Sequence, residues 1–117
     1  ARADLILLDV PCSNTGVLAR RIHARYRVSP ERTASLVQTQ RQIIADALRL
    51  RSPSAEARGG ILYSTCSLDV EENEKQAEWA AHWHAFSKKR EHRRAPAGGP
   101  GEPAHRYSDG AYAVLLA

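Results

Sequence analysis

The sequence contains no methionine among its 117 residues, and it holds only two cysteines and one phenylalanine. Without methionine it has no initiator residue, and its first residues lack the basic segment followed by an apolar one that marks a secretory signal. We therefore expect an excised part of a longer chain. The longest strongly apolar runs, residues 5–8 and 113–117, fall well short of the ~20 residues that cross a bilayer. This predicts a soluble chain with no membrane partner.

Composition is typical of a globular domain. Hydrophobic residues make up 43% of the chain and charged residues 26%, which is far from the low hydrophobicity of disordered chains. The length suits one ordinary domain or part of a larger one, and it excludes a second full domain.

Charge is unevenly distributed along the chain, whose net charge is +4. Residues 18–32 contain five arginines and one glutamate, and residues 82–106 contain six lysines and arginines against two glutamates. Between these two segments, residues 69–78 hold five acidic residues and one lysine. Clustered arginine is the pattern expected of a protein that contacts a phosphate backbone. From charge alone, a solvated surface is an equal alternative.

The first half of the chain predicts a strand, a helix and a second strand. Residues 4–10 form a continuous apolar run, which is typical of a parallel strand buried on both faces. Residues 11–16 are turn residues at its carboxyl end. Ser29, followed by a proline, marks the start of a helix whose apolar stripe continues to about residue 51. Residues 61–65 form the second strand, and this order is typical of a parallel α/β sheet.

A second helix is predicted in the acidic segment. Asp69 and Glu72 have the spacing of a capping box, with aspartate in the cap position. The helix that they begin is predicted over residues 70–86. Trp79 and Trp83, one helical turn apart, are expected to pack in the core.

The last third predicts a basic loop and a hairpin. Residues 88–106 combine basic side chains with proline and glycine, which is typical of a loop. Asp109 and Gly110 predict a hairpin turn. The two arms of that hairpin are predicted around residues 105–108 and over residues 111–116.

Two cysteines occupy matching places, because Cys12 and Cys66 each follow a predicted strand. Adjacent strand ends of a parallel sheet lie within side-chain reach. A disulfide does not suit a chain without a secretory signal, and the cysteines do not form a recognisable zinc set with His82 and His84. Two interpretations stay open at this point: buried structural cysteines, and reactive thiols presented at strand ends.

Two sequence blocks resemble those of a known family. They are Asp-Val-Pro-Cys-Ser-Asn-Thr-Gly-Val at residues 9–17 and Tyr-Ser-Thr-Cys-Ser at residues 63–67, the latter followed by Glu-Glu-Asn-Glu at residues 71–74. In order and approximate spacing they are similar to the signature of the Sun family of RNA cytosine-5 methyltransferases, and in particular to its bacterial ribosomal RNA enzyme. Residues 109–113 resemble the family's last hairpin. The resemblance implies an α/β fold, with residues 1–117 forming the carboxyl-terminal half of a Rossmann-like class I methyltransferase domain.

The resemblance also implies roles for single residues. It assigns Cys66 as the nucleophile that adds to C6 of cytosine, and Cys12 as the thiol that assists release of the product. Asp9 corresponds to the family acid between the cofactor, S-adenosylmethionine, and the base, where it contacts the cofactor and stabilises charge at N3 of cytosine. Pro11 is expected to leave its carbonyl free for the exocyclic amine of the base. Ser13 belongs to the same substrate-binding loop.

Partners follow from the same resemblance. Arg20, Arg21 and Arg25 come soon after the Cys12 loop, so we expect them to rim the pocket and contact phosphates of ribosomal or transfer RNA. We expect a cytoplasmic enzyme that uses no metal and is monomeric when complete. The family's glycine-rich loop and ribose-binding acid precede the segment that this chain matches. The isolated chain is therefore expected to lack most of the S-adenosylmethionine site.

Two other functions fit these residues less well. A noncatalytic RNA-binding or assembly module would keep the fold, but RNA binding alone needs neither Cys12, Cys66 nor Asp9. A cytosine-5 DNA methyltransferase uses a single Pro-Cys cysteine, and the second block argues against it. One departure from the family pattern is mild: Asn14 stands where many members have glycine, and asparagine tolerates left-handed backbone conformations.

Overall fold

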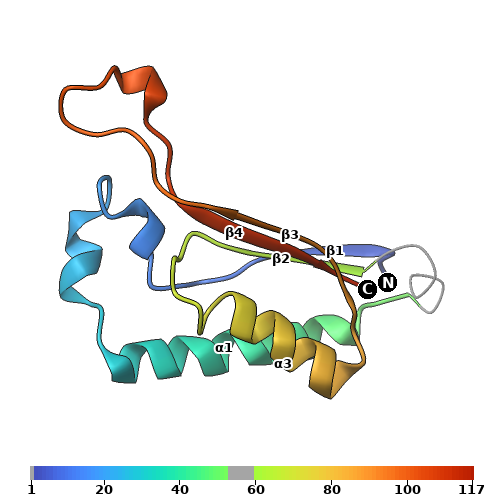
Figure 1. Cartoon of the computed structure of the whole chain (residues 1–117). Coiled ribbons are helices and arrows are strands. Elements are labelled where there is room, and N and C mark those ends of the chain that lie inside the picture. The colour runs from blue at the N-terminus through green and yellow to red at the C-terminus, as the bar shows by residue number, and fades with distance from the viewer. Residues whose placement is uncertain (1, 53–59) are drawn as a thin grey trace.

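The computed structural model describes residues 2–52 and 60–117. Within these residues a four-stranded sheet has the order β1-β2-β4-β3, in which β1 and β2 are parallel and the other neighbours antiparallel. The strands are β1 (Leu5–Asp9), β2 (Gly60–Thr65), β3 (Lys88–Arg94) and β4 (Ala111–Leu116). One face of the sheet carries two helices, α1 (Pro30–Leu48) and α3 (Glu74–His84) (Figure 1). The predicted α/β class is confirmed.

The predicted strand, helix and second strand are confirmed by β1, α1 and β2. Ser29 caps α1, because its side-chain oxygen accepts a hydrogen bond from the backbone N–H of Arg32 at 3.2 Å. The helix ends at Leu48, about one turn before its predicted end. Residues 53–59, between α1 and β2, lie outside the described residues. The core between helices and sheet includes Ile44, Ile61, Tyr63, Tyr112 and Leu116.

Strand β1 was expected to be buried on both faces, and that prediction is wrong for the described residues. Ile6 and Leu8 pack against the core, whereas Leu5 and Leu7 are 57% and 65% exposed. Successive side chains of a strand point to opposite faces of its sheet. Leu5 and Leu7 therefore point away from α1 and α3, on the face that these helices leave open (Figure 1).

The second helix is shorter than predicted. α3 begins at Glu74, and the preceding residues 70–73 form turns. The reason lies in Asn73, whose side chain contacts the loop after β2: its Oδ1 accepts from Thr65 Oγ1 at 2.5 Å, and its Nδ2 donates to the Ser67 carbonyl at 2.8 Å. These contacts hold the chain outside helical geometry. At the other end, Ala85 adopts a left-handed conformation with φ 56° and stops the helix.

The two tryptophans of α3 have different environments. Gln76, Ala77 and Ala80 form the buried side of the helix, and Trp79 packs against the core beside them. Trp83 is 67% exposed, so its predicted place in the core is wrong. It lies in the last turn of α3, beyond the three buried residues in the sequence.

The closing hairpin has a different partner strand from the one predicted. Residues 88–94, expected to be part of a loop, form β3 and pair antiparallel with β4. All seven residues of β3 are exposed, so no apolar alternation marks it in the sequence. Its pairing with β4 defines it instead.

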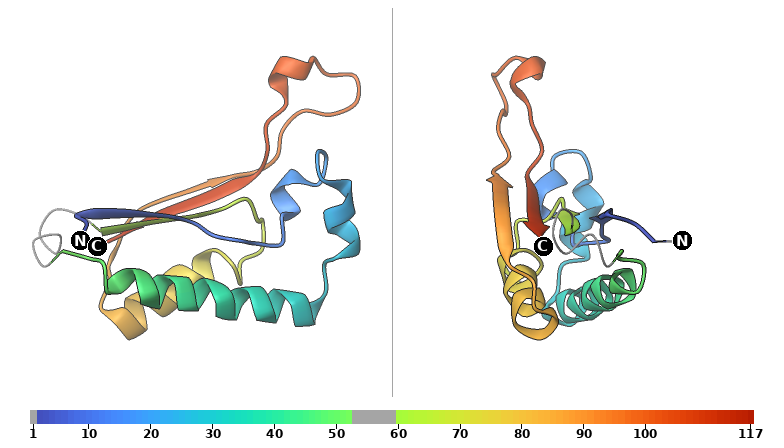
Figure 2. Two further views of the ribbon diagram at one scale, coloured as in Figure 1. Left: turned by 180° about the vertical axis from the view of Figure 1, so that it is seen from behind. Right: turned by 90° about the vertical axis from the view of Figure 1, so that its right-hand side faces the viewer.

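Between β3 and β4 the chain forms a long projection. Residues 95–110 extend away from the sheet and include the short 3-10 helix η3 (Ala104–Arg106) (Figure 2). A bridge between Ala97 and Ser108 joins the two sides of the projection. Asp109 therefore precedes β4 at the base of a long loop, and the predicted tight hairpin turn at this position is wrong.

Candidate active site

The two thiols meet at the carboxyl ends of neighbouring strands. Cys12 follows β1 and Cys66 follows β2, and the parallel pairing of these strands brings their Sγ atoms to 3.2 Å. Both cysteines are free, with Cys12 buried and Cys66 partly exposed. Cys66 Sγ also lies 3.0 Å from Oδ1 of Asn14. The convergence predicted from the strand ends is confirmed, and the two thiols form one hydrogen-bonded pair.

The environments of the two thiols shift their pKa values in opposite directions. The hydrogen bond from Cys12 lowers the pKa of the Cys66 thiol to about 7, against an opposing effect of burial. The Arg21 guanidinium lowers that pKa further, while the Asp9 carboxylate raises it. For Cys12, the same hydrogen bond and then burial raise the pKa well above its ordinary value. Near pH 7 the Cys66 thiol is therefore about half ionised, whereas Cys12 stays protonated and can donate to the Cys66 thiolate.

Close backbone approach holds the Cys12 loop against the loop after β2. Asn14 has φ 61°, the left-handed conformation expected of it. Two residues later, Gly16 donates its N–H to the Cys66 carbonyl at 2.8 Å and accepts from the Gly110 N–H at 2.7 Å. A Cβ atom at Gly16 would lie 2.4 Å from the Cys66 carbonyl oxygen. Glycine is required here because any side chain would separate the two thiol loops.

Glu72 joins the same two loops through its side chain. The carboxylate is fully buried. Its Oε1 accepts from the Ser13 N–H at 2.9 Å and from Gln40 Nε2 at 3.2 Å, and its Oε2 accepts from the hydroxyls of Ser13 and Ser67. Sequence reasoning assigned Glu72 to a capping box and missed this role. Its location directly after the Cys66 block was the available signal.

A buried amide pair extends this network beneath the Cys12 loop. Gln40, the polar member of the apolar stripe of α1, is fully buried and donates to the Pro11 carbonyl at 3.0 Å. Gln40 therefore occupies one of the two acceptor positions of the carbonyl that was predicted to meet the base. Gln76 of α3 donates in turn to Oε1 of Gln40 at 2.9 Å. The polar break in the stripe was the only sequence signal of this contact.

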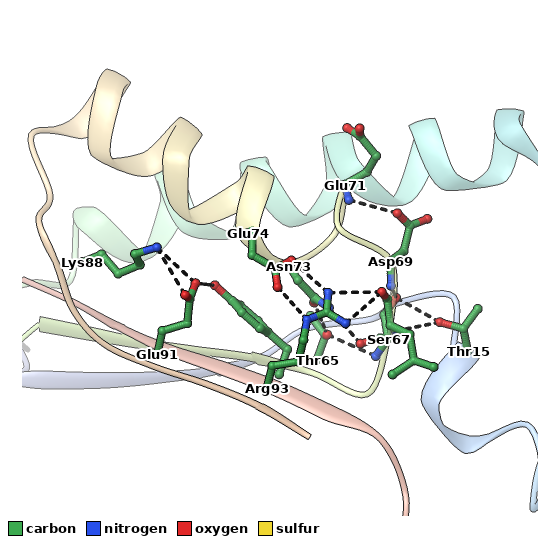
Figure 3. A network of polar contacts seen from close by, with 12 residues as sticks. Thr15, Thr65, Ser67, Asp69, Glu71, Asn73, Glu74, Lys88, Glu91 and Arg93 are labelled. Atoms are coloured by element: carbon green, nitrogen blue, oxygen red, sulfur yellow. Dashed lines mark hydrogen bonds and ion pairs between the residues drawn. The ribbon is translucent and has the colours of Figure 1, made fainter. Parts of the chain in front are cut away.

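Hydroxyl groups complete the packing of the two loops. Thr15 Oγ1 accepts from the Leu68 N–H at 2.8 Å, and it lies 3.2 Å from Ser67 Oγ (Figure 3). Ser67 Oγ lies 3.2 Å from Ser13 Oγ. Ser13, expected to bind substrate, thus has its N–H and hydroxyl engaged inside the protein. Its contacts position the Cys12 loop.

Asp9 ends β1 on the face of the sheet opposite the helices. Ser64 Oγ of the paired strand donates to its Oδ1 at 3.2 Å, in an exposed environment. The Asp9 carboxylate also raises the pKa of the nearby Cys66 thiol. An exposed carboxylate beside a reactive thiol is available to a ligand on the open face.

The predicted arginines differ in their surroundings. Arg20 forms an ion pair with Asp109 at the base of the projection, which holds the pKa of that carboxyl below its ordinary value. Arg20 and Arg21 line a pocket of about 550 Å³ together with Cys12 and Ser13. Arg25 is exposed and is not among the residues that line this pocket.

Residues 2–52 and 60–117 provide neither a metal-binding cluster nor a membrane-spanning helix. These residues contain no group of three or more His, Cys, Asp or Glu side chains arranged to hold a metal ion. The helices among them are also too short or too polar to span a membrane.

Comparison with solved structures defines the class of this fold. The structure of NSun6 from Pyrococcus horikoshii with SFG matches 98% of the chain with a TM-score of 0.70 and 24% identity, over 30% of its own length. A methyltransferase homolog protein from Pyrococcus horikoshii matches 99% of the chain with a TM-score of 0.68 and 21% identity, over 39% of its length. The fold is that of a Rossmann-like methyltransferase.

Sequence comparison identifies the family within this class. The chain belongs to the family described as 16S rRNA methyltransferase RsmB/F, whose model matches residues 1–105. A curated relative, ribosomal RNA small subunit methyltransferase F of Klebsiella pneumoniae (strain 342), is 40% identical over 76 residues. That alignment covers 65% of this chain and 15% of the relative. The predicted family resemblance is confirmed.

Proposed function

We propose that residues 1–117 are the carboxyl-terminal part of the catalytic domain of an RNA methyltransferase. The enzyme would use S-adenosylmethionine to methylate C5 of cytosine in ribosomal RNA, with transfer RNA as the alternative substrate. Family membership supports the RNA methyltransferase assignment. Methylation at C5 of cytosine is the more specific part of the proposal, and the thiol pair supports it.

The observation that carries the proposal is the unequal thiol pair. C5 of cytosine is a poor nucleophile, so a thiolate must first add at C6 to convert the ring into an enamine. A thiol with a pKa of about 7 supplies such a thiolate at neutral pH. Cys66 is that thiol, and its partial exposure leaves it accessible to a base. An RNA-binding or assembly module would need no such asymmetry.

Cys66 starts the proposed cycle by forming a C–S bond to C6, with the electron pair of the C5–C6 double bond moving into the ring toward N3. A proton shared between the Asp9 carboxyl group and N3 would stabilise the charge that develops there. S-adenosylmethionine, when bound, supplies an electrophilic methyl group. Loss of the C5 proton then drives elimination of the Cys66 thiolate and restores the double bond.

Cys12 is suited to the release step by the same hydrogen bond that first keeps it protonated. While Cys66 is a thiolate, that bond is the main cause of the raised Cys12 pKa. Once Cys66 becomes a thioether, it carries no charge to hold the Cys12 proton. The Cys12 pKa then falls, although burial still raises it. Cys12 can pass its proton to a solvent base, and the resulting thiolate accepts the C5 proton as the Cys66 thiolate leaves. Covalent attachment of Cys66 would thereby activate its partner.

S-adenosylmethionine would contact this site on the open face of the sheet, at Asp9. Asp9 supplies an exposed carboxylate on the open sheet face, beside Cys66, and hydroxyl or amino groups of S-adenosylmethionine are suitable donors to it. Neither the glycine-rich loop nor the ribose-binding acid of the family's cofactor site matches a segment of this sequence. We expect those groups to come from elsewhere in the methyltransferase. As a whole it is proposed to act in the cytoplasm, as a monomer.

Replacing each cysteine by alanine in the complete methyltransferase tests the proposal. With Cys66→Ala no C6 adduct can form, so methylation should vanish and no denaturation-resistant protein–RNA complex should appear. With Cys12→Ala attack and methyl transfer proceed while release slows, so a complex that survives denaturing electrophoresis should accumulate. Cys12→Ser is the matched control, because it retains a hydrogen-bond donor to Cys66.

Three results would contradict these assignments. Adduct accumulation in the Cys66 variant alone would reverse the roles of the two thiols. Adduct in neither variant, with methylation intact, would exclude the two-cysteine mechanism. Structural cysteines would only lower stability, by about 1–3 kcal/mol each, and would trap no RNA.

A further inference from the structure

Beside the thiol pair lies the pocket of about 550 Å³, and it is formed by one continuous segment of the chain. Its lining comes from residues 12–36, which include the 3-10 helices η1 (Thr15–Val17) and η2 (Ile22–Tyr26) and the first turns of α1. Its volume falls in the range of ligand-binding pockets, roughly 300–1,000 Å³.

The chemistry of the pocket favours an anionic, partly flat ligand. Four arginines line it, Arg20, Arg21, Arg27 and Arg32, and of these Arg20 is paired with Asp109. Among these lining residues there is no Asp or Glu side chain. Guanidinium groups bind phosphate oxygens through paired N–H donors. Apolar surface for a ribose or base comes from Ala24, Val28 and Leu36. A nucleotide has both properties.

The position of the pocket relative to the thiols identifies which nucleotide it would hold. Cys12 lines the pocket, but Cys66, Asp9 and Pro11 do not. The sulfur atom that would attack cytosine therefore lies outside the lining of the pocket. Because the Sγ atoms of Cys12 and Cys66 are 3.2 Å apart, the pocket begins immediately beside the site of attack.

We infer that this pocket binds the nucleotide adjacent to the target cytidine, with Arg27 and Arg32 contacting its phosphates. The inference rests on the proposed function and extends it to a second nucleotide of the substrate. A neighbour that enters the pocket cannot remain stacked in a duplex. The substrate class is therefore RNA in which the target and one neighbour are both unpaired, as in a loop or an opened helix end.

RNA with neutral linkages tests this inference in the complete methyltransferase. Each oligonucleotide carries the target cytidine and one methylphosphonate, placed in turn at the phosphates of the target and of its two neighbours. For the wild-type enzyme, a neutral linkage at one neighbour should raise KM roughly tenfold, as expected for loss of a charge-assisted hydrogen bond. The value of kcat should remain the same.

A pair of arginine variants makes the test specific. In Arg27→Ala/Arg32→Ala, KM for unmodified RNA should rise, and the same neutral linkage should add less than a twofold effect because its partner is gone. Arg27→Lys/Arg32→Lys keeps the charge and should give an intermediate KM. The control is Arg49→Ala, which replaces an exposed arginine at the carboxyl end of α1. In this variant the neutral linkage should raise KM as much as it does in the wild type.

The inference and the proposed function fail in different ways. If no RNA is methylated at cytosine C5 by the wild-type enzyme, the proposed function is wrong. If methylation is normal but the neighbour's linkage has the same effect in wild type and double variant, the pocket does not hold that nucleotide. A penalty confined to the target's own phosphate would place the target itself in the pocket, and would also overturn the inference.

Discussion

Two regions of this sheet, the carboxyl ends of β1 and β2 and the edge strand β3, differ in the environment of their polar residues. At the carboxyl ends of β1 and β2, polar groups are buried and bonded to one another, with Glu72 and Gln40 both fully inaccessible to solvent. At the opposite edge, all seven residues of β3 are exposed, and its polar contacts are surface pairs such as that of Arg93 with Glu74 (Figure 3). The loops after β1 and β2 are rich in hydrogen bonds within the protein, whereas β3 is rich in solvated charge.

This difference predicts unequal consequences of substitution. A buried polar group that loses its partner keeps its desolvation cost, about 1–3 kcal/mol for a neutral group. An exposed ion pair contributes only about 0–1 kcal/mol, because water and salt replace the partner. Substitutions around the thiols should therefore lower the free energy of unfolding more than substitutions in β3.

The largest effect is expected for Glu72→Ala. The change leaves the N–H of Ser13, two hydroxyls and the Gln40 amide without their shared acceptor. Each buried neutral donor left unsatisfied costs about 1–3 kcal/mol, and urea unfolding of the methyltransferase would measure the summed loss. Glu71→Ala is the matched control, since this neighbouring side chain is exposed and should change stability by about 0.5 kcal/mol or less. Equal effects of the two substitutions would refute the contrast.

Glu72 also illustrates what the sequence could and could not predict. Cys12 and Cys66 were predictable as a pair, because strand order and the parallel crossover bring matching strand ends together. The partners of Glu72 come from three segments, and hydrophobic periodicity treats a glutamate as a surface residue wherever it occurs. Only the folded loops show that its carboxylate is enclosed by donors.

β3 was missed for a different physical reason. Its sequence, Lys-Lys-Arg-Glu-His-Arg-Arg, has no alternation of apolar and polar residues, and strand prediction depends on that alternation. The strand exists because β4 presents an unpaired backbone edge to it. Local sequence therefore predicted the three strands that carry apolar residues and failed at the one that has none.

A second test of the thiol end is Gly16→Ala. The new Cβ would lie 2.4 Å from the Cys66 carbonyl oxygen and 2.7 Å from that of Gly110, so the Cys12 loop must move away from both. We expect a loss of about 1–3 kcal/mol in the free energy of unfolding, typical of overpacking. Gly99→Ala, with no atom within 4 Å of the added Cβ, should have almost no effect. A tolerated Gly16→Ala with unchanged Cys66 reactivity would show that the loops do not need close contact.

A smaller effect is expected when Cys12 is removed as a donor to Cys66. Alkylation of Cys66 by iodoacetamide should follow a pKa of about 7 in the wild type, increasing as pH rises through that value because the thiolate is the reactive form. In Cys12→Ala the main cause of the lowered pKa is absent, and burial and Asp9 still raise it. The midpoint should move toward the ordinary thiol value, and the rate at pH 7 should fall by about tenfold. Cys12→Ser should restore part of the shift, and an unchanged midpoint in the alanine variant would exclude the donor role.

The smallest effect is expected at the outer edge, for Arg93→Ala. Arg93 binds Glu74 at 2.6 Å and the Leu68 carbonyl at 3.2 Å, but both charged side chains are partly exposed, so the loss should be about 0.2–1 kcal/mol. The guanidinium lowers the pKa of Glu74 from its ordinary value of 4.5. The pair therefore stabilises the fold above that value, and its contribution should disappear as the pH falls below it. Unfolding of wild type and variant at low and high ionic strength would measure the difference, which should shrink in ~1 M salt through screening. A loss larger than that of Gly16→Ala, or one that 1 M salt leaves unchanged, would mean that the outer edge is held as firmly as the thiol end.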